Sequence, residues 1–328
     1  MIAVRAKILE LLRGRSGEFV SGEEISGGLG VSRTAVWKNI QEIRQVGYGI
    51  EAHSRRGYSL VSIPDKLLPE EITVRLTTQR LGKRIYYYDD IASTNNRAKA
   101  LAVEGEPEGT LVVAEAQNSG RGRMARGWFA PWGKGIWMSI LLRPPFSPQD
   151  APKCTLMAAV AVNKAIRQVA GLDCGIKWPN DILYQGRKLV GILTEMSAEM
   201  DAINYVVLGM GINVNISQSD FPDDISAIAT SIAAASGKKI NRIELLAVIV
   251  KHLEDIYQAV VADGFTPVLD EWRTQSITLG QVVDVVGVNR KFSGIAVNID
   301  DDGALLVQTG DRLEKVLAGD VSIRPSVQ

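Results

Sequence analysis

The first sixty residues carry apolar positions at helical spacing. Residues 3–12 form a predicted helix whose apolar face consists of Val4, Ile8, Leu11 and Leu12. Ser21 and Glu24 match the S-x-x-E capping box, which predicts a short second helix with Ile25 and Leu29 inward, ended by Gly28 and Gly30. Ser32 is expected to cap a third helix from Arg33 to about Val46, whose apolar stripe is Val36, Ile40, Ile43 and Val46.

A basic hairpin is predicted after these helices. Short strands at Ile50–Ala52 and Tyr58–Leu60 flank a turn that contains Arg55 and Arg56. Three helices followed by such a hairpin are typical of a winged helix-turn-helix domain, here residues 1–62. Residues 61–69 contain Pro64 and Pro69 and predict a linker.

Strand and helix patterns alternate through the middle of the chain. Strands are predicted at residues 84–89, 110–117, 136–142, 189–195 and 205–209. Helices are predicted after Ser93 and at residues 151–170, 241–263 and 266–275. This mixture favours an α+β domain with a mixed sheet over residues 63–276.

From residue 277 the pattern changes to short strands separated by Asp-Gly and Gly-Asp turns. They are predicted at residues 282–286, 291–298, 304–308 and 313–317. The sequence therefore predicts a third domain, a small β barrel at residues 277–328.

Composition adds little for the whole chain, because 37 basic residues balance 37 acidic ones. Residues 1–62 hold nine Lys/Arg against six Glu, a surplus compatible with nucleic-acid binding. Cys154 and Cys174 are expected to be buried thiols rather than a disulfide or a zinc site. Arg5, Lys7 and Glu10 interrupt the first apolar run and no other run is long enough to cross a membrane, so we expect a cytoplasmic protein.

Three segments are candidates for chemistry. Residues 117–128 combine three arginines and three glycines after a strand, which suits a phosphate or carboxylate ligand but equally a solvated basic loop or a nucleic-acid loop. Residues 177–181 and 187–193 place Lys188 just before an apolar strand, although Pro179-Asn180-Asp181 alone would be an ordinary turn. Residues 209–215 form a weak glycine pattern, for which a strand-end turn is the simpler interpretation.

Two absences narrow the chemistry. The two histidines are His53, in the predicted wing, and His252, which we expect to be a solvated or satisfied helix residue. A Ser/His/Asp hydrolase or a His-liganded metal enzyme is therefore disfavoured. The sequence G-x-x-x-x-G-K-[ST] does not occur, which excludes a P-loop ATPase.

Taken in order, these motifs resemble the bifunctional biotin–protein ligase and biotin-operon repressor family. The likeness is carried by Gly120–Trp128, Lys177–Asp181, Arg187–Leu193 and Gly211–Asn213, with Ser93-Thr94-Asn95 before them. It covers nearly the whole chain and implies a winged helix, a central α+β ligase domain and a C-terminal SH3-like barrel.

The resemblance also implies site residues. Those implied to contact biotin are Ser93, Thr94, Asn95, Gln117, Arg121, Gly122, Arg123 and Lys188. Those implied on the nucleotide side are Lys177, Asn180, Asp181 and Asn213. Those implied to act in catalysis are Arg121, Arg123 and Lys188. The chain departs from the family at Ala125, where glycine is usual, and residues 217–231 are too divergent for any residue to be transferred.

The third helix supplies the expected DNA contacts. The residues off its apolar stripe are Arg33, Thr34, Trp37, Lys38 and Gln41, which suit a major groove, while Arg55 and Arg56 of the wing suit phosphates.

The reaction implied by the resemblance joins two anions, so it needs cations rather than a catalytic base. Biotin's carboxylate attacks the α-phosphate of ATP, with Mg²⁺ on the phosphates, and the adenylate then acylates a lysine of a biotin carboxyl carrier protein. The adenylate is also the implied corepressor of a homodimer on operator DNA. Two alternatives stay open: a ligase whose DNA-binding domain no longer regulates, and a transcription factor that senses biotin or adenylate without transfer. The lipoate ligases share the central fold but fit the Arg-Gly loop and the winged helix poorly.

Overall fold

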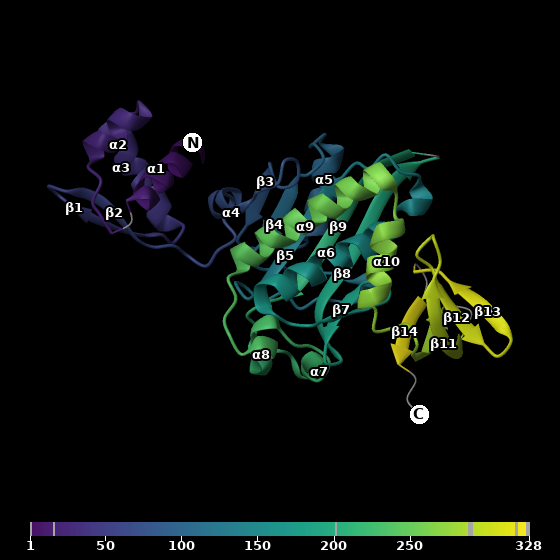
Figure 1. Cartoon of the computed structure of the whole chain (residues 1–328). Coiled ribbons are helices and arrows are strands. Elements are labelled where there is room, and N and C mark those ends of the chain that lie inside the picture. Colours follow the sequence, from purple (N-terminus) through teal and green to yellow (C-terminus); the bar gives the residue numbers. More distant parts are fainter. Residues whose placement is uncertain (1, 16, 201, 288–290, 319–320, 326–328) are drawn as a thin grey trace. The chain divides into compact units, whose positions relative to one another are not determined.

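The computed structural model describes residues 2–15, 17–200, 202–287, 291–318 and 321–325, and the chain divides into two units, residues 1–66 and 67–328 (Figure 1). Within the described residues, no helix combines the length and the apolarity that crossing a bilayer requires.

Serine caps begin two of the three helices of the first unit, which are α1 (Ile2–Gly14), α2 (Gly22–Leu29) and α3 (Arg33–Gln45). Ser21 Oγ accepts the N–H of Glu24 at 3.0 Å, and Ser32 Oγ accepts the N–H of Ala35 at 3.2 Å. Each cap satisfies a backbone donor that the first helical turn leaves unpaired, as predicted.

Two details of the predicted helices were wrong. Leu11 is 38% exposed, whereas Leu9 is buried beside Ile8 and Leu12 because this set follows the i, i+1, i+4 spacing of one helical face. Gly28 lies inside α2 and does not end it; the helix ends at Gly30, which adopts the left-handed conformation at a φ of 65°.

The hairpin consists of β1 (Gly49–His53) and β2 (Gly57–Ser62), paired antiparallel. Val20 joins β2 through two backbone hydrogen bonds with Tyr58, of 2.8 and 2.9 Å. At Gly57, where φ is +105°, a Cβ atom would lie 2.0 Å from the Val20 carbonyl oxygen, so only glycine fits. This contact holds the turn end of the hairpin, next to Arg55 and Arg56, against Val20.

The predicted linker, residues 61–69, was too long at both ends, because β2 extends to Ser62 at its N-terminal side. Leu67 and Leu68 are buried, and Pro69 begins helix α4 (Pro69–Arg75), where proline suits the first turn because its missing N–H would be unpaired there anyway. The segment between β2 and the core of the second unit is therefore residues 63–66.

A seven-stranded mixed sheet forms the centre of the second unit, in the order β3-β4-β5-β9-β8-β7-β6. Only the pair β3–β4 is parallel. The strands are β3 (Ile85–Tyr88), β4 (Leu111–Ala114), β5 (Gly135–Leu142), β6 (Gly175–Lys177), β7 (Asp181–Tyr184), β8 (Arg187–Glu199) and β9 (Ala202–Asn213). The predicted mixed sheet is confirmed, although β6 and β7 were missed.

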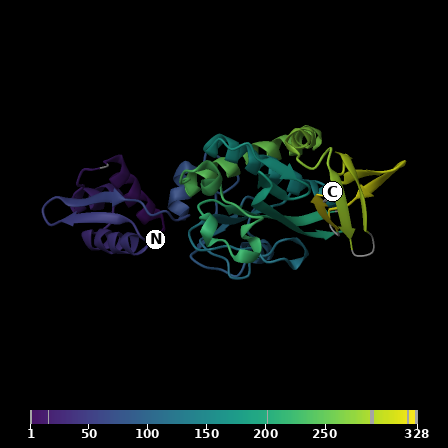
Figure 2. The same ribbon diagram turned by 90° about the horizontal axis from the view of Figure 1, so that it is seen from below.

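Helices cover both faces of this sheet. Both faces carry apolar side chains to bury, because alternate residues of a strand point to opposite sides. Val112 packs against α5 (Thr94–Val103) on one face. Leu111 and Val113 face a larger cluster made with α6 (Lys153–Ala170), α9 (Arg242–Asp263) and α10 (Thr266–Gln275). Figures 1 and 2 show α9, in green, along that face. The short helices are η1 (Arg123–Ala125), η2 (Pro148–Asp150), η3 (Gln218–Asp220), α7 (Asp223–Ser226) and α8 (Ile232–Ser236).

An antiparallel five-stranded sheet forms the C-terminal part, in the order β13-β12-β11-β10-β14. Its strands are β10 (Val282–Gly287), β11 (Lys291–Ile299), β12 (Leu305–Thr309), β13 (Arg312–Val316) and the unpredicted β14 (Val321–Pro325). Closure into an SH3-like barrel stays a prediction. The indole N–H of Trp178 donates to the Gly303 carbonyl at 3.0 Å, and Lys153 donates to the Asp301 carbonyl at 3.0 Å, which ties the sheet to the central part of this unit.

Candidate functional site

One cavity of about 950 Å³ lies over the central sheet of the second unit. All twelve residues predicted to hold a small ligand line it. They come from the start of α5, the loop at residues 118–127, the segments around β6–β8 and the end of β9, and they are Ser93, Thr94, Asn95, Gln117, Arg121, Gly122, Arg123, Lys177, Asn180, Asp181, Lys188 and Asn213. Their individual roles stay predictions.

At one end of the cavity the polar groups are buried and hydrogen-bonded to one another. Ser93 caps α5, and the next residue, Thr94, donates its backbone N–H to Gln117 Oε1 at 2.8 Å. Ser139 Oγ lies 2.8 Å from Thr94 Oγ1 and 2.6 Å from Asn95 Oδ1. Since Thr94, Asn95 and Ser139 are all buried, this end is fixed before any ligand arrives.

Glu195 closes the same cluster from β8. Its carboxylate accepts Asn95 Nδ2 at 2.8 Å and pairs with Lys99 Nζ at 2.6 Å. Burial raises the pKa of Glu195, but the hydrogen bonds from Lys99 and Asn95 outweigh burial and hold the pKa below its ordinary value. The carboxylate is therefore ionised at neutral pH.

Glycines in β8 and β9 make room on the floor of the cavity. A Cβ atom on Gly209 would lie 2.0 Å from Asn95 Oδ1, and one on Gly211 would lie 2.6 Å from the indole of Trp128. A Cβ atom on Gly191 would also meet Trp128, at 2.7 Å. The strand-end turn considered for residues 209–215 was therefore wrong, because Gly209 and Gly211 lie inside β9 and let side chains reach the sheet backbone.

The loop at residues 118–127 closes on itself through the Gly122 N–H, which donates to the Arg126 carbonyl at 2.8 Å. Met124 and Ala125 have φ values of 55° and 54°, in the left-handed region. Ala125, where the family usually has glycine, therefore adopts a conformation that its Cβ atom disfavours. Each such residue costs about 1–2 kcal/mol, which places backbone strain in this loop.

Arg123 connects this loop to two other parts of the second unit. It donates to Asn180 Oδ1 at 3.2 Å and to the carbonyl oxygen of Ala318, in the C-terminal part. Four more residues of that part line the cavity: Ile277, Thr278, Gln281 and Val283. The C-terminal sheet therefore supplies part of the cavity wall.

Lys188 lines the cavity beside the Asp181 carboxylate and the Trp128 ring. Its Nζ atom is 2.7 Å from Asp181 Oδ1 and 5.3 Å from the centre of the Trp128 ring. Asp181 is the one acidic residue among the described residues that line the cavity. Within the described part of the chain, no group of three or more His, Cys, Asp or Glu residues is placed to hold a metal ion.

Two of the predicted nucleotide-side residues also hold backbone in place. Asn180 Nδ2 donates to the Ile192 carbonyl at 2.8 Å, and Asn213 Nδ2 donates to the Thr230 carbonyl at 3.1 Å. Residues 228 and 230 pair with the backbone of Lys188. The segment at residues 217–231 is thereby fastened beside Lys188.

Several lining residues were missed from the sequence. The divergent segment contributes Phe221, Ile225, Ile228 and Ala229, and the arginine loop is followed by Trp128 and Phe129. The aromatic residues beside an arginine loop were an available signal, because rings commonly line ligand pockets. Nothing in the spacing of residues 277–283 indicated that the C-terminal part reaches the cavity.

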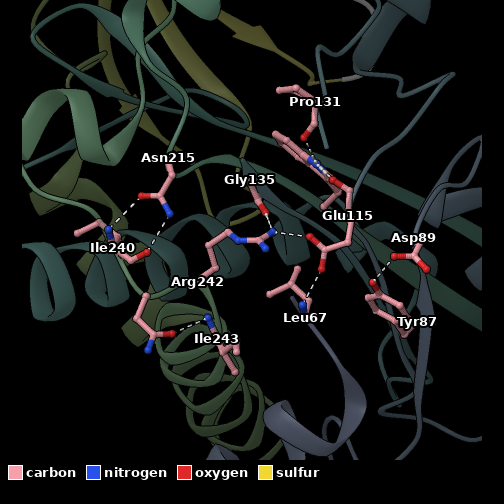
Figure 3. Close-up of polar contacts among 12 residues, drawn as sticks. Leu67, Tyr87, Asp89, Glu115, Pro131, Gly135, Asn215, Ile240, Arg242 and Ile243 are labelled. Atoms are coloured by element: carbon pink, nitrogen blue, oxygen red, sulfur yellow. Dashed lines mark hydrogen bonds and ion pairs between the residues drawn. The ribbon is translucent and has the colours of Figure 1, made fainter. Parts of the chain in front are cut away.

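Glu115, two residues before the cavity residue Gln117, is bonded to the point where the second unit begins (Figure 3). This fully buried carboxylate accepts the backbone N–H of Leu67 at 2.6 Å and pairs with Arg242 at 2.8 Å. Its backbone carbonyl accepts the N–H of Gly133 and the indole N–H of Trp137. The strand that leads to Gln117 is thus bonded directly to the chain arriving from residue 66.

The two cysteines and His252 have the structural surroundings that the sequence predicted for them. Cys154 and Cys174 are free and buried, and burial raises the pKa of each thiol to about 12. Neither supplies a thiolate at neutral pH. His252 hydrogen-bonds with Gln168 Oε1 at 2.8 Å, as a satisfied helix residue.

The predicted DNA-binding side chains of the first unit are exposed, except Gln41, which is half-buried. The exposed ones are Arg33, Thr34, Trp37, Lys38, Arg55 and Arg56. The guanidinium of Arg56 stacks 4.0 Å above the Phe19 ring, and Phe19 contacts the His53 ring edge-on. The Arg56 guanidinium of the wing is thus exposed to solvent and held on one side by an aromatic ring.

Known proteins match this chain over all its parts. The family models that match are an HTH domain at residues 4–59, the Biotin/lipoate A/B protein ligase family at 87–213 and the Biotin protein ligase C terminal domain at 278–324. The bifunctional ligase/repressor BirA of Bacillus subtilis is 44% identical over 98% of both chains, and that of Escherichia coli is 29% identical over 98% of this chain and 97% of its own. The biotin protein ligase of Aquifex aeolicus, solved with biotin and ATP, superimposes with a TM-score of 0.66 at 27% identity, covering 74% of this chain and all of that one.

Proposed function

The chain belongs to the bifunctional ligase/repressor family of biotin–protein ligases, and we propose that its cavity performs both half-reactions of that activity. Biotin is activated with ATP to biotinyl-5′-adenylate, and biotin is then transferred to a lysine of a biotin carboxyl carrier protein. The observation that carries the assignment is the convergence of all twelve motif residues on one cavity.

Biotin is assigned to the end of the cavity whose buried polar groups are hydrogen-bonded to one another. Ser93, Thr94, Asn95 and Gln117 offer polar atoms for its ureido ring, and Met138 lines the neighbouring wall. Arg121, Gly122 and Arg123 then lie along the loop toward the carboxylate. The nucleotide is assigned to the side of Lys177, Asn180, Asp181 and Asn213.

Lys188 is the central catalytic residue of the proposal. A carboxylate oxygen of biotin attacks the α-phosphorus of ATP, the new P–O bond forms, and the bond to pyrophosphate breaks. The Lys188 ammonium, with Arg121 and Arg123, offsets the repulsion between the two anions and stabilises the charge that develops at the phosphorus. No proton is removed in this step, because biotin's carboxylate is already ionised at neutral pH.

Mg²⁺ is proposed to arrive with ATP, whose phosphates it would neutralise. The site fits an ion held mainly by phosphates, because Asp181 is the single acidic side chain among the described lining residues. Asp181 also sets the position of Lys188 through their ion pair.

The second half-reaction needs the adenylate kept from water until the carrier arrives. The loop at residues 118–127 and the apolar side chains of residues 217–231 are proposed to cover it. The amine of the carrier lysine attacks the acyl carbon, an amide forms, and AMP leaves.

Incorporation of radiolabelled biotin into a carrier domain, with ATP and Mg²⁺, tests the enzymatic proposal. We expect label in the carrier with the full-length chain and none without ATP. Binding of biotin without any transfer would instead support a transcription factor that only senses its ligand.

For the repressor activity, we propose that α3 enters the major groove through Arg33, Thr34, Trp37, Lys38 and Gln41, while Arg55 and Arg56 contact phosphates. Biotinyl-adenylate acts as corepressor by favouring a homodimer that reads a two-fold operator. Operator binding and sedimentation, each with and without adenylate, test this part. An adenylate that changes neither would leave a ligase with a non-regulatory DNA-binding domain.

We also propose the domain division 1–62, 63–276 and 277–328, and action in the cytoplasm, where ATP and carrier protein are available.

A further inference from the structure

A chain of hydrogen bonds runs behind the biotin end of the cavity. It begins at Glu195, passes through Asn95 at 2.8 Å and Ser139 at 2.6 Å, and reaches Thr94 Oγ1 at 2.8 Å. Among the described residues that line the cavity, Thr94 and Asn95 appear but Ser139 and Glu195 do not. The chain therefore connects a charge outside the cavity to a hydroxyl inside it.

The number of hydrogens on each group fixes the direction of donation along this series of hydrogen bonds. The ionised carboxylate of Glu195 has no hydrogen, so Asn95 must turn its amide nitrogen toward it and its Oδ1 toward Ser139. Ser139 has one hydrogen and cannot donate in both of its contacts, so it donates to Asn95 Oδ1. The Thr94 hydroxyl then has two acceptors within reach, Ser139 Oγ at 2.8 Å and Gln117 Oε1 at 3.1 Å, and we assign its hydrogen to the shorter contact. Every hydrogen points toward Glu195.

This direction decides what the cavity offers to a ligand. Thr94 Oγ1 keeps its lone pairs for the ligand, and donation toward an anion makes it a stronger acceptor. Gln117 receives the Thr94 backbone N–H on its Oε1, so its Nε2 faces the ligand as a donor. An acceptor beside a donor matches the N–H and C=O groups of a cyclic urea.

We propose that Glu195 is a positioning residue that sets the donor and acceptor polarity of the biotin end through Asn95 and Ser139. The proposal rests on the assignment of biotin to this end. Asn95 Nδ2 also donates to the Leu193 carbonyl, at the longer distance of 3.3 Å. A neutral amide at position 195 removes the stronger of these two acceptors, so Asn95 reverses more readily. Ser139 then donates to Thr94, and one lone pair of Thr94 is lost to the ligand.

The test is a double-mutant cycle on the full-length protein, with biotin affinity measured by calorimetry in the absence of ATP. Glu195→Gln keeps the shape and removes the charge, and we expect it to weaken biotin binding about tenfold. Ser139→Ala interrupts the same chain and should weaken binding comparably. The double variant should lose no more than the larger single loss, because the second change acts on a chain already broken.

Lys99→Met is the matched control, because it removes the ion pair of Glu195 but leaves the carboxylate and its bond to Asn95. It should bind biotin within about twofold of the wild type. A second readout is a biotin methylated on its ureido nitrogens, which has no N–H to donate. The preference of the wild type for biotin over this analogue should shrink in Glu195→Gln, whereas a purely structural defect would weaken both ligands equally.

Additive losses in the cycle, or an unchanged preference between the two ligands, would overturn the role of Glu195. If Glu195→Gln does not fold, Ser139→Ala alone decides: unchanged biotin affinity in that variant overturns the proposal. A wild-type chain that fails to bind biotin at all would instead refute the proposed function on which this inference rests.

Discussion

The two ends of the cavity are built in opposite ways. At the end of Thr94 and Asn95, side chains are buried and bonded to groups on the sheet. At the loop end, Met124 is 55% exposed, and both it and Ala125 have a left-handed backbone. The first arrangement is fixed before binding, which favours affinity and selectivity. The second arrangement holds backbone strain in an exposed loop, which favours movement of that loop. The two arrangements together suit an enzyme that must first select biotin and later release a reactive product.

The largest effect is expected at Lys188, which lines the cavity beside the Asp181 carboxylate. Lys188→Ala should slow adenylate synthesis by about 100-fold or more, because the cation that offsets two anions is lost. Transfer from preformed adenylate should change far less. Pyrophosphate release and single-turnover transfer measure the two steps. Lys164→Ala, a lysine paired with Glu271 on α6 and α10, is the control that should affect neither. Equal losses in both steps would show that Lys188 serves binding or folding in general.

Arg123→Ala should disturb the loop end and leave the fixed end intact. Losing a charge-assisted bond to the adenylate phosphate should weaken adenylate binding by about 1.5–3 kcal/mol. Biotin alone should lose less affinity, because the proposed contacts of its ureido ring at the fixed end remain. Calorimetry with each ligand separates the two, and Arg167→Ala, an exposed arginine of α6, is the matched control. Unchanged adenylate affinity would remove Arg123 from the site.

Ala125→Gly should reduce the strain of the loop. Without a Cβ atom the left-handed conformation is no longer penalised, which stabilises the loop by up to about 1 kcal/mol. Hydrogen exchange of the Gly122 amide, bonded to the Arg126 carbonyl, should therefore slow by about fivefold. Faster exchange would mean that the freedom glycine gives to the open loop outweighs the relief of strain.

The smallest effect concerns the charge of Glu195 at the fixed end. Its folded-state pKa lies below the ordinary value of 4.5, so the ionised form stabilises the fold at higher pH. The difference in unfolding free energy between wild type and Glu195→Gln should be constant above about pH 5 and shrink as the pH falls below 4.5. Urea unfolding at several pH values measures it. A difference that does not change with pH would mean that the charge adds nothing to stability.

Elements with a periodic face and a side-chain cap were predictable. Ser21, Ser32 and Ser93 each begin a helix, and the apolar pattern of α6 and α9 specified long core helices. β6, β7 and β14 have three to five residues each and were missed, whereas the equally short β3 and β4 were predicted as parts of the longer runs 84–89 and 110–117. α4 was hidden because Pro69, which begins it, is also a typical linker residue.

The site was predictable where motifs carry its residues and not where packing alone brings them in. The sequence indicated twelve residues that line the cavity, but not Thr278 and Gln281 of the C-terminal part. Ser139 and Glu195 each lie in an apolar strand pattern, and only the three-dimensional fold sets them behind Asn95. The left-handed conformation of Ala125 opposes its own propensity, so no local rule predicts it.

The contribution of the C-terminal sheet to the cavity wall has a consequence for modularity. Thr278, Gln281 and Val283 line the cavity, Ala318 accepts a hydrogen bond from Arg123, and the Gly303 turn is held by Trp178. A chain ended at residue 276 would lose one wall of its ligand site. We therefore expect that an active fragment must extend from residue 67 past residue 318.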